Sequence, residues 1–531
     1  MTSTLISGNQ VYATGIPDAE AILIDKGQIA WIGDRSTAKT FASDVSQSFD
    51  LGDVFIAPGF VDAHVHLSAT GALLSGASVS TATSWRELAE QVNESLLTQE
   101  VIDQFKFFFG WDDTNWSDSV EDFRSHLTER SEQLNWYLAR VDGHSAIANL
   151  PKLNLFATLL SGIRRQEIWT YCTSELRSDF LESSIRTALV HAAQNGIVSV
   201  HENGGPTVSS KSDFETVIAL ARNSALPEVI AYWADSDIDA ALQMGAYGVA
   251  GDFSVDGSLG SRTALLSQPY SDAKTEYGFE QLTIRQIADQ FISATVRGVQ
   301  AGFHAIGDLA CAQVHSGLLL ALEKVTSAQI RSCRHRIEHL TMPTSESLEL
   351  YAELGLVASV QPSFDAYWGG AGGMYEQRLG LDRLANSHPF GAMSQAGLAL
   401  AFGSDSPVTF GSPWTWIQAA TEHNQAEQRL TTRAAFAAAT RGGRRAAKQD
   451  SHGVLAVGAP ADLAIWQVPA YEDLTTQHDA SRAVKRAKVT NWSTDARSGT
   501  HPLPDLKQGL PTCLATIRDG QFIFDGLGVT G

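Results

Sequence analysis

Two histidines separated by one residue stand at the end of an apolar run near the start of the chain. The run covers residues 54–61, and Asp62-Ala63-His64-Val65-His66 follows it. Alternate side chains of an extended strand share a face, so His64 and His66 can approach one metal ion together. Neutral imidazole is a preferred ligand of zinc and similar divalent ions. The same spacing also occurs in ordinary strands, so the pair alone leaves both interpretations open.

Further residues of ligand type stand at the C-terminal ends of later apolar runs, namely His304, His339 and Asp405. In a (β/α)₈ barrel, the C-terminal ends of the strands converge on the face that carries the active site. Polar residues at strand ends can also be simple exits to solvent. Recurrence at five positions, with His64 and His66, favours a shared site over chance.

The middle of the chain alternates short strand-like runs with helical stretches. The strand candidates are 196–201, 248–255, 298–304, 335–339, 356–361 and 398–405, and the helix candidates are 180–194, 212–224, 284–296 and 310–325. Such alternation implies a parallel sheet, and this number of units favours a closed barrel over an open sheet.

The two ends of the chain carry β-type runs, at 21–33 and at 462–466 and 514–524. Neither end can bury a core alone, so we expect them to pair into one small composite β-sandwich. The predicted fold class is α/β. It comprises a TIM-like barrel at 58–449, sandwich parts at 1–57 and 450–531, and an inserted subdomain at about 68–186 that covers the barrel mouth.

Composition excludes some classes of partner. The 531 residues carry a formal net charge of −21, which argues against binding to nucleic acid. No stretch approaches the roughly 20 apolar residues needed to cross a membrane, and the N-terminal residues lack signal-peptide features. The four cysteines form no CxxC pair, so we expect buried thiols and a cytoplasmic location. A small molecule is the expected substrate.

The motifs around these residues resemble the amidohydrolase superfamily, and specifically its family-3, YtcJ-like branch. The matching segments run almost end to end, at 57–66, 142–146, 256–264, 304–308, 335–339, 403–407 and 458–463. The resemblance implies that His64 and His66 leave barrel strand 1. It places His304 on strand 5, His339 on strand 6 and Asp405 on strand 8.

The activity that the resemblance implies is metal-assisted hydrolysis with one or two divalent ions, of which Zn²⁺ is favoured. A bound ion of this kind lowers the pKa of a water molecule to roughly 7. Asp405 would take the proton as hydroxide attacks and would pass it to the leaving group. His339, with the metal, would polarise the scissile carbonyl.

One position departs from the family pattern. Many two-metal relatives carry a carboxylated lysine on strand 4, four residues before the Asp-Gly pair that corresponds to Asp256-Gly257, and Asp252 stands there instead. Either Asp252 bridges or binds a metal, or the site holds one ion only, and a carboxylate that orients a histidine from outside is the competing role of Asp252. Glu202, assigned to the end of strand 3, is an alternative substitute ligand. The ligand set that we expect is His64, His66, Asp252, His304, His339 and Asp405.

Two residues are candidates for binding substrate. Arg262, on the loop after strand 4, can hold a carboxylate or carbonyl through its planar fork, and a structural salt bridge is its alternative role. His144 lies in a family motif, and a hydrogen-bonded structural histidine is its alternative role.

Several functions compete. The leading one is hydrolysis of a C–N bond in a non-peptide amide, such as an N-acyl or N-formyl compound. Deamination and hydrolysis of cyclic amides or esters can use the same metal site. A catalytically silent binding barrel is disfavoured because the ligand residues are all present. A homodimer, common in this superfamily, is one option for the assembly.

Overall fold

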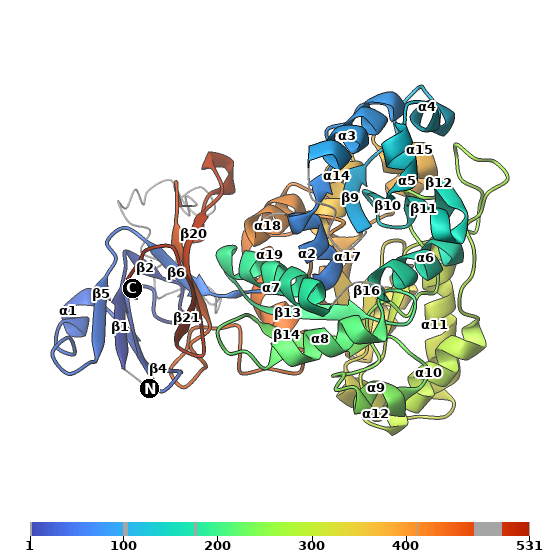
Figure 1. Cartoon of the computed structure of the whole chain (residues 1–531). Coiled ribbons are helices and arrows are strands. Elements are labelled where there is room, and N and C mark those ends of the chain that lie inside the picture. Colours follow the sequence, from blue (N-terminus) through green and yellow to red (C-terminus); the bar gives the residue numbers. More distant parts are fainter. Residues whose placement is uncertain (1–2, 99–104, 175–177, 411, 472–501, 530–531) are drawn as a thin grey trace.

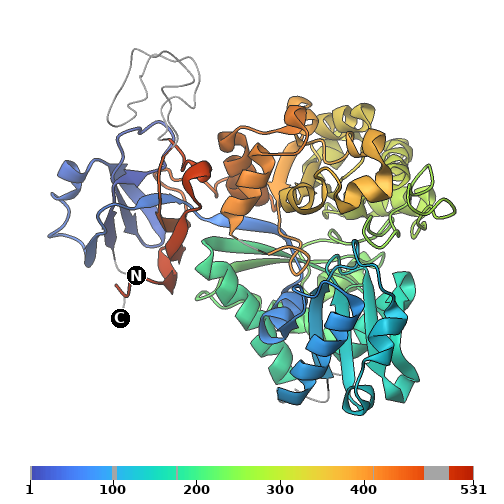
Figure 2. The same cartoon turned by 90° about the horizontal axis from the view of Figure 1, so that it is seen from above.

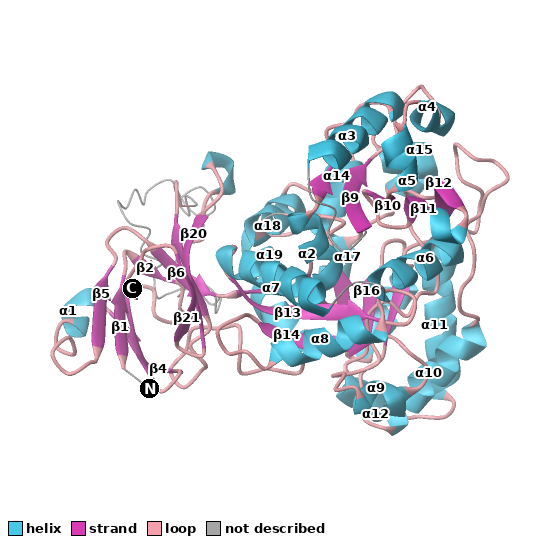
Figure 3. Cartoon of the chain, in the orientation of Figure 1, coloured by secondary structure: helices cyan, strands magenta, loops and turns pink. Residues whose placement is uncertain are grey.

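The structure, a computed structural model, describes residues 3–98, 105–174, 178–410, 412–471 and 502–529 (Figure 1). Helices surround most of the strands except in the β-rich part that holds both chain ends (Figure 3). Within the described ranges, no helix combines the length and the apolar character needed to cross a membrane.

The two ends of the chain build two small sheets together. One has the order β4-β3-β1-β5, with β1 (Thr4–Ser7), β3 (Ala21–Asp25), β4 (Gln28–Gly33) and β5 (Gln47–Asp50). The other has the order β2-β6-β19-β20-β21, with β2 (Gln10–Val11), β6 (Phe55–Pro58), β19 (Leu463–Gln467), β20 (Thr512–Arg518) and β21 (Gln521–Asp525). Ile56 of β6 lies opposite Ile465 of β19, and both belong to one buried cluster with Ile6 and Ile22. The N-terminal and C-terminal segments therefore share one hydrophobic core, and each buries its apolar face against the other.

The central strands are parallel and fall into two sheets. The first has the order β14-β13-β7, with β7 (Phe60–Val65), β13 (Ile197–Gly204) and β14 (Glu228–Trp233). The second has the order β15-β16-β17-β18, with β15 (Gly302–Ala305), β16 (Arg336–His339), β17 (Val357–Val360) and β18 (Ala399–Phe402). Single parallel bridges link the sheets on both sides, at Tyr232–Gly248, Val249–Ala301 and Val65–Ser406.

The placement of Glu202 on the third strand was wrong. Its strand, β13, pairs directly with β7 and is therefore second in order. The third strand is β14, which the sequence patterns did not reveal. The strands between β7 and β13 pair with one another in a separate sheet, so they take no place in the parallel order.

The four predicted helices are confirmed as α7 (Ser178–Gln194), α8 (Lys211–Ala221), α10 (Ile284–Val296) and α11 (Asp308–Leu322). In α10, a capping box of Thr283 and Gln286 starts the helix, and buried Ile287 and Phe291 follow at helical spacing. The Phe291 ring lies 4.6 Å from that of Phe303 in β15, so α10 packs on the parallel strands.

The remaining helices are short, apart from α3 and α6 described below. They are α1 (Arg35–Ala38), α2 (Leu67–Ser75), α4 (Val120–Ser125), α5 (Glu129–Gln133), α9 (Ile238–Gln243), α12 (Ser327–Cys333), α13 (Ser345–Glu353), α14 (Pro362–Trp368), α15 (Met374–Leu379), α16 (Leu381–Leu384), α17 (Phe390–Gln395), α18 (Pro413–Thr421), α19 (Thr432–Ala437) and α20 (Gly443–Ala446).

A third sheet lies between β7 and β13 in the sequence. Its order is β12-β11-β10-β9-β8, with β8 (Ala77–Ser78), β9 (Phe105–Trp111), β10 (Asn135–Arg140), β11 (Ser145–Leu150) and β12 (Leu155–Ser161). Phe107 packs on Trp169 of α6 (Gly162–Ser174), while Phe108 belongs to the cluster on the opposite face with α3 (Trp85–Thr98). Helices thus cover both faces, and Figure 2 shows this unit, in blue to cyan, as a body beside the parallel strands.

Candidate metal centre

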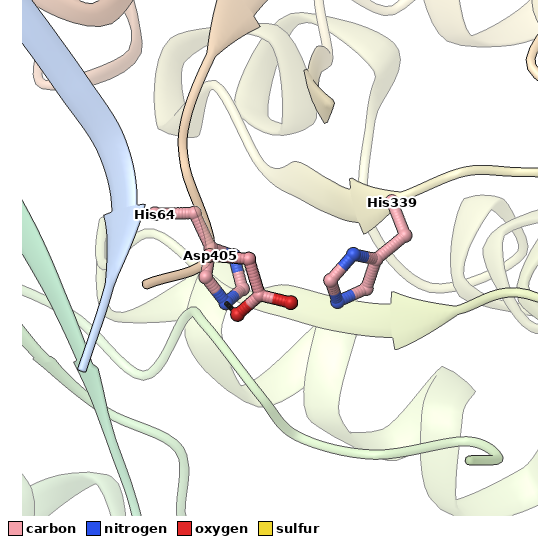
Figure 4. A group of neighbouring side chains, drawn as sticks. All are labelled: His64, His339 and Asp405. Atoms are coloured by element: carbon pink, nitrogen blue, oxygen red, sulfur yellow. Dashed lines mark ion pairs between the residues drawn. The ribbon is translucent and has the colours of Figure 1, made fainter. Parts of the chain in front are cut away.

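The predicted ligands from β7 and from the residues after β18 meet in the structure. His64 Nε2 lies 3.5 Å from Oδ1 of Asp252 and 3.3 Å from Oδ1 of Asp405. His66 Nε2 lies 3.2 Å from Oδ2 of Asp252 and 3.2 Å from Oδ1 of Asp405. Figure 4 shows His64 and Asp405 together, with the His339 ring facing them from β16. The carboxylates of Asp252 and Asp405 therefore each lie close to the imidazoles of both His64 and His66.

Asp252 connects this group to a second one. In each of three triplets, one donor atom per residue lies within 4.8 Å of the other two; the triplets are His64–His339–Asp405, His64–His66–Asp252 and Asp252–His304–His339. Asp252 belongs to two of them, and its Oδ1 lies 3.9 Å from His339 Nε2. The short Asp252 side chain thus lies between His64 and His66 on one side and His304 and His339 on the other.

The donor set fits a divalent cation such as zinc. It consists of imidazole nitrogens and carboxylate oxygens, which are the usual zinc ligands. Within the described part of the chain, buried His64 Nε2, Asp252 Oδ1 and His304 Nε2 have no hydrogen-bond partner. Buried polar atoms are nearly always paired, so these three atoms are placed for a ligand that the chain does not supply.

The backbone is strained where two of these side chains leave their strands. His339 has φ of 67° and Asp405 has φ of 54°, in the left-handed region that residues with a Cβ seldom adopt. Strain of this kind persists where the surrounding structure imposes it, and it clusters at functional sites. The amide of Asp405 donates to the carbonyl of His64 at 2.8 Å, which holds the ends of the first and last parallel strands together.

A buried ion pair orients His64. Its Nδ1 lies 3.0 Å from Oε2 of Glu338, and Arg336 Nε donates to the other carboxylate oxygen at 2.6 Å. Burial raises the pKa of Glu338, but the Arg336 charge and His64 outweigh it and lower that pKa to about 2. An ionised carboxylate only accepts, so Nδ1 carries a proton and Nε2 faces the site. Burial lowers the pKa of His64, but Asp252 and Asp405 outweigh it and raise that pKa well above its usual value.

His304 and His339 have comparable outer partners. His339 Nδ1 lies 2.8 Å from Oε1 of Gln361. His304 Nδ1 lies 3.4 Å from Oδ1 of Asp256. The Asp256 carboxylate also accepts from the amide of Ile306 through Oδ1 at 3.1 Å and from that of Gly307 through Oδ2 at 2.8 Å. Both Nδ1 atoms thus face outer partners, which leaves Nε2 of each ring for the site.

Electrostatics make the cluster strongly attractive to cations. Burial lowers the pKa of His66, but Asp252 and Asp405 outweigh it and raise that pKa to about 10. Burial raises the pKa of Asp405, yet His64 and its neighbours hold it well below its usual range. The two carboxylates therefore stay ionised and need positive charge between them, which protons or a metal ion can supply.

A cavity of about 230 Å³ opens onto these ligands. His66, Asp252, His304, His339 and Asp405 form part of its wall. The inserted sheet and its helix α6 form another part, with Phe109, Tyr137, His144, Arg165 and Trp169. A cavity of this size suits a small substrate.

His144 lies in this cavity, as expected, with its ring 5.6 Å from that of His304. Burial lowers the pKa of His144 to about 3, so its ring is neutral.

Arg262 lies elsewhere. Its guanidinium makes a two-point ion pair with Asp272, at 3.2 Å from Nε and 2.7 Å from Nη2, and it is not part of the cavity wall. The structure thus shows the salt bridge that was its alternative role.

Glu202, the alternative metal ligand, belongs to none of the three donor triplets. Its Oε2 accepts from the amide of Leu67 at 2.7 Å, which fixes the first turn of α2 directly after His66. Burial raises the pKa of Glu202 to about 8.

The sequence reasoning missed several residues that shape the site. Two of them could have been found from the sequence. Arg336 stands two residues before Glu338, on the same face of a strand, and Gln361 ends the strand candidate 356–361. Asp256 stands in one of the family motifs, but its role was not predictable, because its hydrogen bonds to the loop after strand 5 form only in the folded chain. Arg165 carried no signal, because only the folded insertion brings it to the cavity.

The described fold is shared with solved structures of other proteins. A solved structure of an uncharacterized metal-dependent hydrolase from Pyrococcus furiosus superposes with a TM-score of 0.67, at 24% identity, over 87% of this chain and 98% of the other. Among curated proteins, Protein LONG AFTER FAR-RED 3 of Arabidopsis thaliana is 26% identical over 90% of this chain and 89% of its own length. Putative amidohydrolase YtcJ of Bacillus subtilis (strain 168) is 24% identical over 76% and 80%.

The amidohydrolase family model matches residues 47–524, so the chain belongs to the amidohydrolase family. The resemblance inferred from the motifs is confirmed, including its YtcJ-like character. The protein is a hydrolase of carbon–nitrogen bonds.

Proposed function

We propose that the protein is a metal-dependent hydrolase of small non-peptide amides, of N-acyl or N-formyl type. The observation that carries this proposal is the convergence of six ligand-type side chains at one end of the parallel strands, five of which line a single cavity. Family membership supports C–N hydrolysis, and the size of the cavity supports a small substrate.

The barrel is part of the same proposal. The two parallel sheets and the bridges through 248–249 and Val65–Ser406 support a closed (β/α)₈ barrel over residues 58–449. The paired terminal strands support a composite sandwich of 1–57 and 450–531, of which 472–501 lie outside the described residues. The sheet β8–β12 supports an insertion at about 68–186.

We assign the ligands to two neighbouring positions that share Asp252. His64, His66 and Asp405 would hold an ion on one side, and His304 and His339 on the other, so one or two divalent ions fit, with Zn²⁺ the first choice. When bound, such an ion supplies Lewis acidity and makes water a better nucleophile at neutral pH.

The chain's own residues move the proton and orient the substrate. Asp405 is ionised and lies in the cavity wall, so one carboxylate oxygen can accept a proton from the attacking water and pass it to the leaving nitrogen. His339 and neutral His144, both in the wall, are placed to orient the carbonyl group.

The test is a hydrolysis screen of amides, formamides, esters and cyclic ureas with added Zn²⁺ or Mn²⁺, run with wild type and Asp405→Asn. We expect release of an amine and a carboxylic acid by wild type, and loss of turnover with retained fold in the variant. Release of ammonia would instead identify a deaminase, and full activity of Asp405→Asn would remove its role as proton carrier. The cytoplasmic location and the homodimer stay predictions.

A further inference from the structure

Arg165 brings a positive charge into the cavity from outside the parallel strands. It belongs to α6 of the inserted unit and forms part of the cavity wall beside Gly143, where a Cβ built on the glycine would lie 3.9 Å from Nη2. His144 follows Gly143, and its ring lies next to the candidate ligand His304. The guanidinium is therefore close to the metal centre in the same cavity.

No described carboxylate forms an ion pair with Arg165, and its Nε is buried without a hydrogen-bond partner. The neighbouring polar group is the neutral Tyr137 hydroxyl, which the Arg165 charge affects but which carries no counter-charge. Arg140, in the same wall, is matched by Asp112, Asp113 and Asp142 at 2.8, 3.0 and 3.2 Å. A desolvated guanidinium nitrogen without an acceptor costs free energy that an anionic ligand would recover.

The acids near Arg165 are engaged elsewhere. Asp142 accepts from the hydroxyls of Ser258 and Ser261 at 2.9 and 2.8 Å in addition to its pair with Arg140. Asp252 and Asp405 face the histidines of the metal centre. Glu202, also in the wall, accepts from the amide of Leu67. The cavity thus holds a guanidinium that no carboxylate of the described residues neutralises.

We propose that Arg165 binds a carboxylate of the substrate, which makes N-acyl amino acids the substrate class of this enzyme. The planar fork of arginine matches a carboxylate with two parallel hydrogen bonds. In an N-acyl amino acid, one carbon separates the amide nitrogen from the carboxylate, as suits an anion site close to the metal centre. Phe109, Tyr137 and Trp169 offer an apolar wall for the side chain or the acyl group.

This inference rests on the proposed function and specifies its substrate. Water adds to the amide carbonyl carbon, the C–N bond breaks, and the proton from water passes to the nitrogen, so the products are a carboxylic acid and a free amino acid. Arg165 takes no part in these bond changes. It is a specificity residue that holds the substrate.

The test compares N-acetylphenylalanine, in both enantiomers, with N-acetylphenethylamine, which lacks only the carboxylate. Wild type should prefer one enantiomer of the acid. Arg165→Met should raise KM for that acid by about 10- to 100-fold, with little change in kcat and no change for the uncharged amide. Arg165→Lys should fall between them, because lysine keeps the charge and loses the fork.

Arg164→Met is the matched control, because Arg164 precedes Arg165 and its exposed side chain pairs with Glu167 on the surface. It should behave as wild type.

Equal turnover of the acid and the uncharged amide would overturn the inference and leave the proposed function standing. Absence of turnover on every amide would overturn the proposed function. In that case, calorimetry can measure the binding of N-acetylphenylalanine to wild type and Arg165→Met after both have been treated with a chelator. Binding that is lost in Arg165→Met would still support the anion site. Equal binding by wild type and Arg165→Met would overturn the anion site.

Discussion

The imidazole of His64 is constrained on both of its nitrogens. Glu338 holds Nδ1, while Nε2 faces the two aspartates of the site. Arg336 in turn neutralises Glu338, and its Nη2 also donates to the carbonyl of Ala63 at 2.6 Å. A chain of buried charges therefore keeps a proton on Nδ1 and fixes the direction in which Nε2 points.

Replacing Glu338 by glutamine should break this chain. The variant leaves the Arg336 charge buried without its partner, which typically costs about 3–5 kcal/mol of the free energy of unfolding. Affinity for Zn²⁺ should fall by about 10- to 100-fold, as measured by competition with a chromogenic chelator. Glu349→Gln, on the exposed face of α13, is the control. Wild-type affinity in Glu338→Gln would show that this carboxylate does not orient His64.

Sequence reasoning could bring five of the proposed ligands together because each stands at a strand end. His64, His66, His304, His339 and Asp405 all follow apolar runs, and in parallel strands such positions meet. The partner of Arg262 and the exposure of Arg165 to the cavity were not predictable in this way. They depend on how loops and the inserted unit fold back, which no local pattern encodes.

At the scale of elements, the ends of β7 and β18 approach each other more closely than a side chain allows. A Cβ built on Gly403 would lie 2.6 Å from the amide nitrogen of His64. Glycine permits this approach, and Asp62 reinforces it by accepting from the amide of Ser404 at 2.9 Å. The close approach and this hydrogen bond therefore hold the two strand ends together.

Gly403→Ala should separate these strand ends. We expect a loss of about 1–3 kcal/mol in the free energy of unfolding, because the added methyl group meets backbone atoms. Zn²⁺ affinity should fall as well, because His64 and Asp405 shift apart. Gly370→Ala is the matched control, since its Cβ would meet only Asn424 Oδ1 at 3.6 Å. Equal stability of the two variants would contradict the close approach.

The strands were predicted unevenly. Runs that end in a polar ligand, such as β15 and β16, stood out, whereas β14 (Glu228–Trp233) ends in aromatic residues and gave no comparable signal. The segment 248–255 forms only isolated bridges, because it runs beside β14 and β15 over too few residues to make a regular ladder. The inserted sheet is apolar on both faces, so its strands lack the alternation that marks a half-exposed sheet.

At the scale of the molecule, the terminal sheets and the parallel strands are joined by an aromatic contact. Trp466 of β19 is 1% exposed, and its ring lies 5.5 Å from Phe60 of β7 and 5.6 Å from Trp414 of α18. Since β6 continues almost directly into β7, the C-terminal strands that cover β6 also support the strand that carries His64. The two chain ends thus contribute to the position of the metal centre.

Trp466→Ala should destabilise both parts together. Removal of a buried tryptophan costs about 3–5 kcal/mol, and unfolding should remain a single transition at a lower denaturant concentration. Val457→Ala, at a site that is 64% exposed, should change little. Two separate transitions in Trp466→Ala, with metal affinity intact, would show that the terminal sheets are independent of the site.

The central claim is that Asp252 joins the histidines into one metal centre that cleaves amides. The most direct measurement is the metal content of the purified protein, with the rate of amide hydrolysis, before and after chelation and after readdition of Zn²⁺. We predict one or two ions per chain in wild type, no hydrolysis after chelation, recovery on readdition, and fewer ions with no recovery in Asp252→Ala. Undiminished hydrolysis by wild type stripped of metal would contradict the account.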